Sequence, residues 1–397
     1  MSGELLSTAR GPLAGVKIIE MAGIGPAPMA AMLFSELGAT VVRIERRIGA
    51  AGGIERPLRF NYVLRGRDAI SLDLKDPAAI EAVLELVEAA DVLIEGFRPG
   101  VMERLGLSPE VCLARKPQLV YGRVTGWGQE GPLANSAGHD INYIALTGVL
   151  NAIGRAGQPP TVPVNLVGDY AGGSLYLVVG ILAALHQARS SGQGQIVDAA
   201  IVDGTAHLAT SLFGMLAAGV WAEERGTNLA DSGAWFYDVY ECADGKWISV
   251  GPLEPKFLKE LLQRVGAEDL GAEASLDPSG WRAARRRLEE IFRTRPQSSW
   301  CEVLDGTDAC FAPVLTMREA PSHPHLRARH TFCEIDGLMQ PAPAPRFSRW
   351  PSQRPQPPQP ADSDVVAALS AFLKKERIDE LVAVGVLRTI EEKTNAG

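Results

Sequence analysis

Short apolar segments alternate with helical patterns through the first third of the chain. PAPMAAMLFSELG (26–38) carries apolar residues at helical spacing, and a second helix is predicted at about 77–89. This alternation predicts βαβ units and a parallel sheet with helices on both faces, which is a Rossmann-like α/β fold. The strand-like apolar runs lie at 16–22, 40–45, 69–74, 92–97 and 119–126.

Two apolar helices are predicted in the middle of the chain, at about 172–189 and 203–221. The short run 195–201 between them predicts one more strand of the sheet. Residues 222–234 are polar and contain glycine, so we expect a linker there. Residues 1–221 would then be the first part of a large domain.

A smaller α+β domain is predicted over 235–330. Within it, residues 237–252 alternate apolar and polar positions about Asp244 and Gly245, which predicts a β-hairpin. A charged helix and a further strand complete the domain, at 281–292 and 311–316.

A return arm, residues 331–397, is predicted to pack on the large domain. Residues 341–361 are proline-rich, which excludes helix and central strand and predicts an extended segment. Two short helices are expected after it, at about 363–375 and 376–394. The length of 397 residues also favours two domains, because it exceeds what one hydrophobic core usually serves.

Composition and charge limit the classes of partner. The formal net charge of −8 and the pI near 5.4 argue against a general nucleic-acid or membrane-surface binder, because both partners are polyanionic. No apolar run approaches about eighteen residues, and the N-terminus shows no leader pattern. The five cysteines lack a C-x-x-C motif, which fits reduced thiols. We expect a soluble, cytoplasmic protein without a bound metal.

GIGPAP (23–28) lies between a predicted strand and a predicted helix, as the glycine-rich turn of dinucleotide-binding folds does. Pro28 stands where the third glycine would be. Glu45, at the end of the next strand, is followed at once by Arg46 and Arg47, so no single acid is placed to contact a ribose. The turn is therefore only a weak signal for a nicotinamide site.

His139 in GHDINY (138–143) and Asp169 in NLVGDYAGG (165–173) are the most informative polar residues. Each lies beside glycine at a predicted loop-to-helix junction. A histidine that can be neutral and a carboxyl group can together take a proton from one face of a carbon and return one to the other. The alternatives are a structural histidine and an aspartate that caps a helix.

Three glycines bear on the choice for the aspartate. Gly168, Gly172 and Gly173 would let a substrate carbonyl approach the backbone and would offer N–H groups to a developing oxyanion. They favour a reactive aspartate over a helix cap.

Seven blocks of the sequence, which include the two peptides around His139 and the glycine-rich turn, resemble in their order along the chain the family III CoA-transferases. Within that family they resemble the racemase branch, the α-methylacyl-CoA racemases. The resemblance runs from about residue 11 to about residue 350, and so many ordered blocks are more specific than one short motif. The blocks lie at 15–46, 71–77, 90–110, 122–143, 192–204, 237–255 and 324–332.

The resemblance implies an enzyme of lipid and fatty acid metabolism that interconverts (R)- and (S)-2-methylacyl-CoA thioesters by proton transfer through an enolate. CoA would enter as part of the substrate, with no separate cofactor. An interlocked homodimer is also implied. The alternative is a CoA-transferase in which Asp169 forms an acyl anhydride. A histidine at position 139 favours the racemase branch, because transferases of this family generally lack it.

The resemblance also assigns roles to individual positions. The positions that match His139 and Asp169 carry the proton in the racemases, and the position that matches Glu254 orients the histidine. Asp238 and Glu241 are alternatives to Glu254, and each could instead be a strand-surface residue. The implied CoA site comprises Arg46, Leu64, Arg65, Gly66, Arg67, Arg98, Gly138, Asp140 and Tyr143.

The arginines of this set follow strands or lie in turns of the α/β region, where open sheets bind ligands. A guanidinium group suits phosphate because its donors form a planar fork. The alternative for each is a solvated surface arginine, and Arg43 is the alternative to Arg46.

Overall fold

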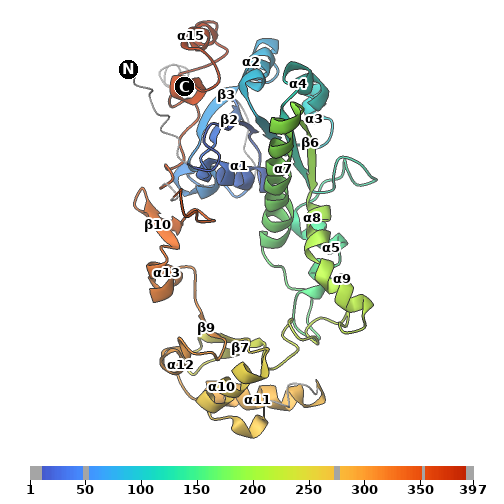
Figure 1. Ribbon diagram of the computed structural model, residues 1–397, viewed down its shortest axis with the longest axis vertical. Helices are drawn as coiled ribbons and strands as arrows, with labels where there is room; N and C mark the ends of the chain where they lie inside the picture. Colours follow the sequence, from blue (N-terminus) through green and yellow to red (C-terminus); the bar gives the residue numbers. More distant parts are fainter. Residues whose placement is uncertain (1–10, 48–52, 272–277, 351–353, 390–397) are drawn as a thin grey trace. The chain divides into compact units, whose positions relative to one another are not determined.

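The structure is a computed structural model that describes residues 11–47, 53–271, 278–350 and 354–389. The chain forms two compact units (Figure 1). Each has its own hydrophobic core, as the length of the chain predicts. The first unit comprises Met1–Ile144, Val164–Leu208 and His330–Gly397, and the second comprises Ala145–Pro163 and Ala209–Arg329.

A six-stranded parallel sheet forms the centre of the first unit, in the order β3-β2-β1-β4-β5-β6. Its strands are apolar on both sides, so that neighbours such as Ile18 and Ile19 point to opposite faces and are both fully buried. The predicted parallel sheet is confirmed. The strands are β1 (Lys17–Met21), β2 (Thr40–Arg46), β3 (Asp68–Leu72), β4 (Val92–Glu95), β5 (Val120–Thr125) and β6 (Gln195–Ala200).

Helices cover both faces of this sheet (Figure 1). One core cluster lies under α1 and α7, and the other lies under α2, α4, α14 and α15. The predicted helix at 77–89 is confirmed; it begins at Pro77, and the Asp76 side chain accepts the N–H of Ala78. The helices are α1 (Pro26–Glu36), α2 (Pro77–Ala89), α4 (Pro109–Arg115), α7 (Tyr176–Ser191), α14 (Val365–Leu369) and α15 (Lys375–Ala383).

The return arm packs on the first unit, as predicted. The Asp362 carboxylate accepts the backbone N–H and the hydroxyl of Ser71, both at 2.6 Å. Arg377 of α15 forms an ion pair with Glu85 of α2 at 2.8 Å. The arm begins with a hairpin that the sequence did not predict, β10 (Phe332–Ile335) and β11 (Leu338–Pro341).

Both C-terminal helices are shorter than the predicted 363–375 and 376–394. α15 ends before Gly385, whose φ of 77° is the left-handed conformation that often follows a helix end. Residues 351–353 of the proline-rich stretch and residues 390–394 of the predicted last helix lie outside the described residues.

The apolar helix predicted at 172–189 begins earlier. η3 (Leu166–Leu175) is a π-helix that continues into α7, so Leu166–Ser191 is one helical stretch of 26 residues, and an 18-residue window within it has a mean hydropathy of 1.5. This corrects the expectation that no apolar run approaches about eighteen residues. By length and composition the stretch could cross a membrane, but this is weak evidence, because core helices have the same properties. Leu177 and Ile181 of the stretch are fully buried.

The helix predicted at 203–221 is two helices. α8 (Ile201–Leu208) belongs to the first unit, and α9 (Thr210–Ala217) belongs to the second. Ala209 separates them, with φ −83° and ψ 6° outside helical geometry. The chain therefore changes units at a break that the continuous apolar pattern does not reveal.

An antiparallel three-stranded sheet with helices packed on it forms the second unit. In its core, the Tyr240 hydroxyl donates to the Trp235 carbonyl, and Trp300 Nε1 donates to the Phe292 carbonyl at 2.9 Å. The predicted hairpin is confirmed, with Gly245 at φ 74° in its turn. The elements are β7 (Asp238–Glu241), β8 (Trp247–Val250), β9 (Phe311–Val314), α10 (Pro255–Val265), α11 (Trp281–Phe292) and α12 (Gln297–Leu304).

The second unit contains more of the chain than the predicted 235–330. Residues 145–163 and 209–234 also belong to it. Contacts between these two segments explain the difference, since Arg225 Nε donates to the Asn151 carbonyl at 2.8 Å. The segment expected to be a linker is a folded turn.

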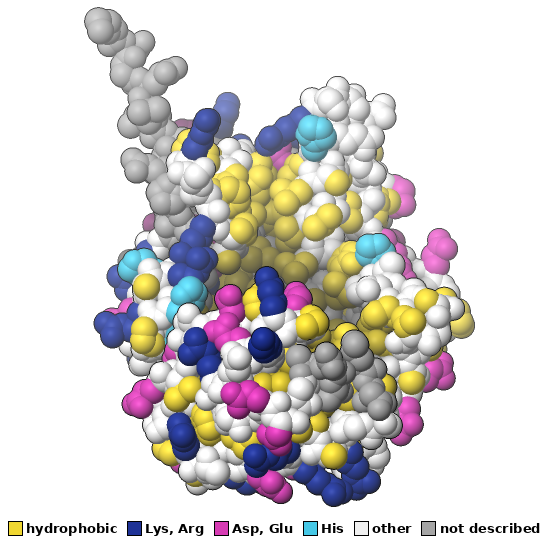
Figure 2. Space-filling model, turned by 60° about the horizontal axis from the view of Figure 1, so that its bottom comes forward, with side chains coloured by type: hydrophobic (Ala, Val, Ile, Leu, Met, Phe, Trp, Pro, Cys, Tyr) yellow, Lys and Arg dark blue, Asp and Glu magenta, His cyan; other side chains and the backbone are white. Residues whose placement is uncertain are grey.

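Charges of both signs lie on the surface. Figure 2 shows lysine and arginine side chains (dark blue) interspersed with acidic side chains (magenta) and hydrophobic side chains (yellow).

The shorter helices of the described residues are η1 (Leu58–Phe60), η2 (Tyr62–Leu64), α3 (Val101–Arg104), α5 (Asp140–Leu146), α6 (Val149–Ala152), η4 (Glu268–Leu270), η6 (Pro278–Gly280), η7 (Ala320–Ser322) and α13 (Pro324–Ala328).

Candidate active site

The turn after β1 lies against Asp169. Gly25 has φ 72°, and a Cβ there would lie 3.3 Å from Asp169 Oδ2. The strand order reverses at β1, which pairs with both β2 and β4, and open α/β sheets bind ligands at such a switch point. The glycine-rich turn therefore lies next to the candidate reactive carboxyl group.

Asp169 lies in the first turn of the π-helix η3. π-Helical turns are rare and occur often at functional sites. The Ser174 hydroxyl lies 2.8 Å from the Pro26 carbonyl and 3.1 Å from the Asp169 carbonyl, and it can donate to either. The Asp169 carboxylate accepts from the Asn165 side-chain amide at 3.3 Å. Asp169 is thus inside a helix, and the helix-cap alternative is wrong.

At each glycine around Asp169, other parts of the protein fill the space that a Cβ would occupy. A Cβ at Gly168 would lie 2.3 Å from Asp140 Oδ2, and one at Gly172 would lie 2.5 Å from Thr205 Oγ1. Gly173 faces Pro26 at 3.0 Å in the same way. The expectation that these glycines let a substrate carbonyl approach and offer N–H groups to an oxyanion stays a prediction.

His139 immediately precedes α5, at the predicted loop-to-helix junction. Its backbone N–H donates to Asn142 Oδ1 at 3.0 Å, and its carbonyl accepts the Asn142 N–H at 2.8 Å. The residue is exposed. Its main chain is therefore held in place while its ring remains accessible.

Tyr143 holds the turn that carries His139. Its hydroxyl donates to the Gly138 carbonyl, and its ring lies edge-on to Trp127 with centroids 4.7 Å apart. A Cβ at Gly138 would lie 2.7 Å from the Tyr143 ring. Gly138 and Tyr143 thus lie beside the candidate base, and their contact with CoA stays a prediction.

Burial raises the pKa of the Asp169 carboxyl group above its ordinary value. The hydrogen bond from Asn165 opposes this shift, the negative charge of Asp140 adds to it, and His139 opposes it. His139 is therefore close enough to interact electrostatically with Asp169. A carboxyl group with a raised pKa is suited to exchange a proton rather than to remain ionised.

Arg46 and Arg98 lie at the carboxyl ends of β2 and β4, and both are exposed. The Arg46 guanidinium lies over the Phe97 ring, 5.5 Å from its centroid. Both arginines can therefore be reached by a phosphate group. Their contact with CoA stays a prediction.

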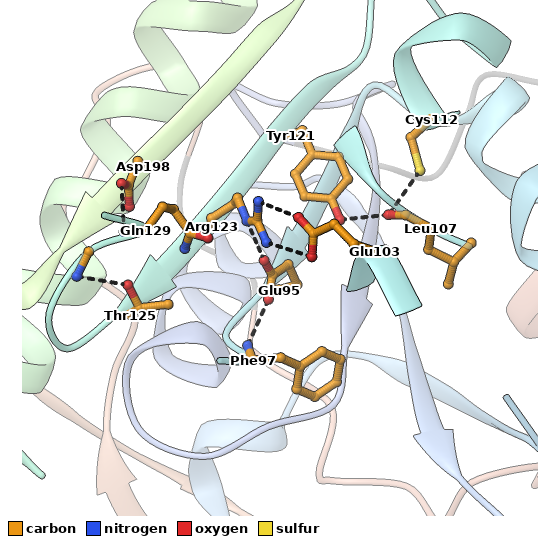
Figure 3. Close-up of polar contacts among 11 residues, drawn as sticks. Glu95, Phe97, Glu103, Leu107, Cys112, Tyr121, Arg123, Thr125, Gln129 and Asp198 are labelled. Carbon is orange, nitrogen blue, oxygen red and sulfur yellow. Dashed lines mark hydrogen bonds and ion pairs between the residues drawn. The ribbon is translucent and has the colours of Figure 1, made fainter. Parts of the chain in front are cut away.

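A buried ion pair fixes the turn that carries Arg98. Glu95 accepts the Phe97 N–H at 2.7 Å and pairs with Arg123 at 2.7 Å, and Arg123 also pairs with Glu103 at 2.9 Å (Figure 3). The close-up shows Phe97 at Glu95 and Glu103 at Arg123, on either side of the Glu95–Arg123 pair. This network sets the path of the backbone immediately before Arg98.

Arg65 and Arg67 are buried and bonded within the protein. Arg65 Nε donates to Glu36 at 2.8 Å, and Arg67 Nη1 donates to Glu20 at 2.8 Å. Gly66 between them has φ 74°. Leu64, another predicted CoA-site position, is also buried. Arg43, the alternative to Arg46, is buried too and pairs with Glu45. The positions of Leu64, Arg65, Gly66 and Arg67 thus favour a structural role, and their CoA contacts stay predictions.

Glu254 is exposed and lies in the second unit, where its backbone forms the N-cap of α10 without a side-chain cap hydrogen bond. Of its two alternatives, Asp238 is buried and pairs with Arg155 at 2.8 Å, and Glu241 pairs with Arg293 at 3.1 Å. Of the three acids, Glu254 keeps its carboxylate accessible. The pairing of Glu254 with His139 stays a prediction.

The family model for CoA-transferase family III matches residues 13–364. The chain belongs to CoA-transferase family III. The family resemblance and the expected fold are confirmed.

The described residues contain no group of three or more His, Cys, Asp or Glu side chains that could hold a metal ion.

Three relatives of this family III chain illustrate the similarity. It is 41% identical over 342 residues to the α-methylacyl-CoA racemase of Mus musculus, which covers 86% of this chain and 87% of the relative. It is 39% identical over 343 residues to the α-methylacyl-CoA racemase of Homo sapiens, with the same coverage. The crystal structure of a CaiB/BaiF family protein from Brucella suis superimposes with a TM-score of 0.78 and 25% identity, covering 92% of this chain and all of that one.

Two residues that contact Asp169 were not predicted. Asn165 lies four positions before Asp169, and Ser174 lies five positions after it. Both contact Asp169 only because η3 begins at residue 166 and is a π-helix. The sequence predicts a helix that begins at about residue 172, which leaves Asn165 and Asp169 outside the helix, so these contacts with Asp169 were not expected.

Proposed function

We propose that this chain is an α-methylacyl-CoA racemase that interconverts (R)- and (S)-2-methylacyl-CoA thioesters. The observation that carries the proposal is the combination of an accessible His139 with an Asp169 carboxyl group whose pKa is raised by burial. Identities of 41% and 39% to proteins with this name, over 86% of the chain, support it.

In one direction, neutral His139 takes the α-proton. The C–H electron pair moves into the thioester carbonyl and forms an enolate, and His139 becomes an imidazolium. Protonated Asp169 then gives its proton to the opposite face of the same carbon and becomes a carboxylate. The product has the inverted configuration, and the pair of side chains still holds one proton.

The opposite enantiomer reacts when the shared proton is on His139 and not on Asp169. Asp169 as a carboxylate takes the α-proton, and the His139 imidazolium returns one to the other face. The two distributions must be close in free energy if both hands are to react at similar rates. Burial and the charge of Asp140 raise the pKa of Asp169 and so favour this balance.

The remaining residues bind and orient the substrate. We propose that CoA enters as part of the substrate, with no separate cofactor, and that exposed Arg46 and Arg98 bind its phosphates. Glu254, which is exposed at the start of α10, is proposed to orient His139 and to stabilise its imidazolium.

We also propose that the protein is a cytoplasmic homodimer acting in lipid metabolism. Exposed apolar side chains around α9 support a protein interface: Phe213 is 55% exposed and Val220 is 72% exposed. A monomer observed by light scattering at micromolar concentration would contradict the dimer.

The second candidate function is CoA transfer through an Asp169 acyl anhydride. The half-buried Asp169 beside the glycine-rich turn would serve as nucleophile equally well, and the family model is named for this reaction. His139 has no part in that route, which is why its accessible position favours racemisation.

The test uses one enantiomer of a 2-methylacyl-CoA in deuterated water, with no second carboxylic acid present. Racemisation with deuterium at the α-carbon is the expected result. A transferase would need an acceptor acid, and trapping an acyl group on Asp169 without racemisation would replace the racemase proposal by the transferase proposal.

A further inference from the structure

Asp140 directly follows His139 in the chain, and its side chain reaches the segment that carries Asp169. Its Oδ2 accepts the backbone N–H of Asp169 at 2.6 Å, and the Gly168 N–H donates to the same carboxylate. A Cβ at Gly168 would lie 2.3 Å from this oxygen, so only glycine allows the approach. One residue therefore connects the main chains of both proton carriers.

The Asp140 side chain faces the protein interior. The residue is 7% exposed, and its Oδ1 is buried without a hydrogen-bond partner among the described residues. A buried carboxylate with one unpaired oxygen is unfavourable unless it serves another purpose. The expectation that Asp140 belongs to the CoA site stays a prediction.

We propose that Asp140 is a positioning residue, whose carboxylate holds the amides of Gly168 and Asp169 and thereby fixes the Asp169 carboxyl group relative to His139. The inference rests on the proposed function, because it assigns Asp140 to the proton transfer described above. Asp140 itself exchanges no proton with the substrate.

The same carboxylate also acts through its charge. Burial is the main cause of the raised pKa of Asp169, and the negative charge of Asp140 raises it further. Asn165 and His139 act in the opposite direction. Burial raises the pKa of the nearby Tyr143 hydroxyl, the charge of Asp169 raises it further, and Arg98 lowers it.

Titratable groups also lie on the other elements packed against η3, but Asp140 is the acid whose charge raises the pKa of Asp169. On α8, Asp203 lies near Asp198, and His207 bonds to the Tyr176 hydroxyl at 2.6 Å. On β5, Arg123 pairs with Glu95. Asp140 is therefore the acid whose removal should change the titration of Asp169 most directly.

Two variants separate position from charge. Asp140→Asn keeps an oxygen that can accept both amides but removes the charge, whereas Asp140→Ala removes both. Asp198→Asn is the matched control, since Asp198 also accepts a backbone N–H, that of Gln129 at 3.2 Å (Figure 3), but does not contact Asp169. Thermal unfolding verifies that each variant is folded.

The readouts are racemisation as a function of pH and the ¹³C titration of the Asp169 carboxyl group, assigned by its loss in Asp169→Asn. At low pH both carriers are protonated and no base remains, so the acid limb of kcat/KM follows the pKa of Asp169. Asp140→Asn should lower that pKa and move the limb to lower pH. Asp140→Ala should also reduce kcat on the order of 10²-fold across the pH range, because the carboxyl group is misplaced.

An unchanged acid limb and an unchanged carboxyl titration in Asp140→Asn, together with native kcat in folded Asp140→Ala, would overturn the inference. The NMR titration does not depend on activity. If Asp140→Asn shifts it while the wild-type enzyme does not racemise, the proposed function fails and the positioning role stands.

Discussion

Glu20 and Asp169 are both acids of the first unit, but their neighbours differ in kind. Glu20 on β1 is fully buried, with Arg67 at 2.8 Å and Arg43 at 3.9 Å. Asp169 is half-buried beside another acid, Asp140, which accepts its backbone N–H. Burial raises the pKa of both carboxyl groups, but two arginines lower that of Glu20 while Asp140 raises that of Asp169 further.

The difference separates a structural from a chemical use of charge. An arginine beside a buried acid stabilises the ionised form of that acid, and the ion pair holds the secondary-structure elements in place. An acid with a second acid nearby holds its proton to a higher pH than the same acid alone, and with access to solvent it can exchange that proton. The kind of neighbour, more than the degree of burial, distinguishes the two roles in this protein.

The largest expected effect is on catalysis. His139→Ala and Asp169→Ala should each reduce racemisation by about 10²–10⁴-fold, because a two-base route fails when either face lacks its group. Neither change should unfold the protein. Polarimetry of one enantiomer measures the loss, and a His139→Ala variant that racemises at the native rate would contradict the two-base assignment.

Removing the partner of Glu20 should instead affect the fold. Arg67→Met leaves the buried carboxylate with only the longer pair to Arg43 at 3.9 Å and should lower the free energy of unfolding by about 3–5 kcal/mol. Glu20→Gln combined with Arg67→Met should be less destabilising than Arg67→Met alone, since no unpaired charge remains. Urea unfolding measures both.

The same Arg67→Met variant also tests the predicted CoA contact. If its stability is native while its affinity for CoA falls, Arg67 belongs to the binding site and the structural interpretation of the Glu20 pair is wrong.

A smaller effect is expected at Gly172. A Cβ there would lie 2.5 Å from Thr205 Oγ1 and 2.9 Å from the Thr205 backbone nitrogen, so Gly172→Ala should destabilise the packing of η3 on α8 by about 1–3 kcal/mol. Gly214→Ala on α9 is the matched control, because a Cβ at Gly214 meets nothing within 4 Å. The control should be neutral or slightly stabilising, since alanine favours helix more than glycine does. Equal losses in thermal unfolding would refute the packing argument.

The smallest expected effect concerns Asp169 and stability. Because its pKa is raised in the fold, its carboxylate destabilises the folded state at pH values above the unfolded pKa of about 3.9. Asp169→Asn should therefore raise Tm by about 1–3 °C at pH 7. The gain should vanish as the pH falls through the folded and then the unfolded pKa. A gain that persists at pH 3 would show another cause.

Much of the fold could be predicted from the sequence. The strands of the parallel sheet and α2 follow from apolar periodicity, and the hairpin follows from Asp244 and Gly245. The break at Ala209 could not be predicted, because the apolar pattern continues through it. Periodicity reports which faces are apolar and says little about which unit a helix joins.

The candidate site was predicted in its chemistry but less well in its surroundings. His139 and Asp169 follow from residue type and glycine context, and the structure brings them close enough to interact. The packing around the glycines could not be predicted, because the atoms nearest to a Cβ at Gly168 and Gly172 come from Asp140 and Thr205, far away in the sequence. Such contacts exist only after the chain has folded.

The most direct test of the central claim compares the two enantiomers in the two single variants. In deuterated water, Asp169 alone should exchange the α-proton of one hand in His139→Ala, and His139 alone should exchange that of the other hand in Asp169→Ala, both without racemisation. Mass spectrometry and NMR of the recovered thioesters measure this. Complementary exchange is the predicted result, and exchange of the same enantiomer by both variants, or of both enantiomers by either one, would contradict the account.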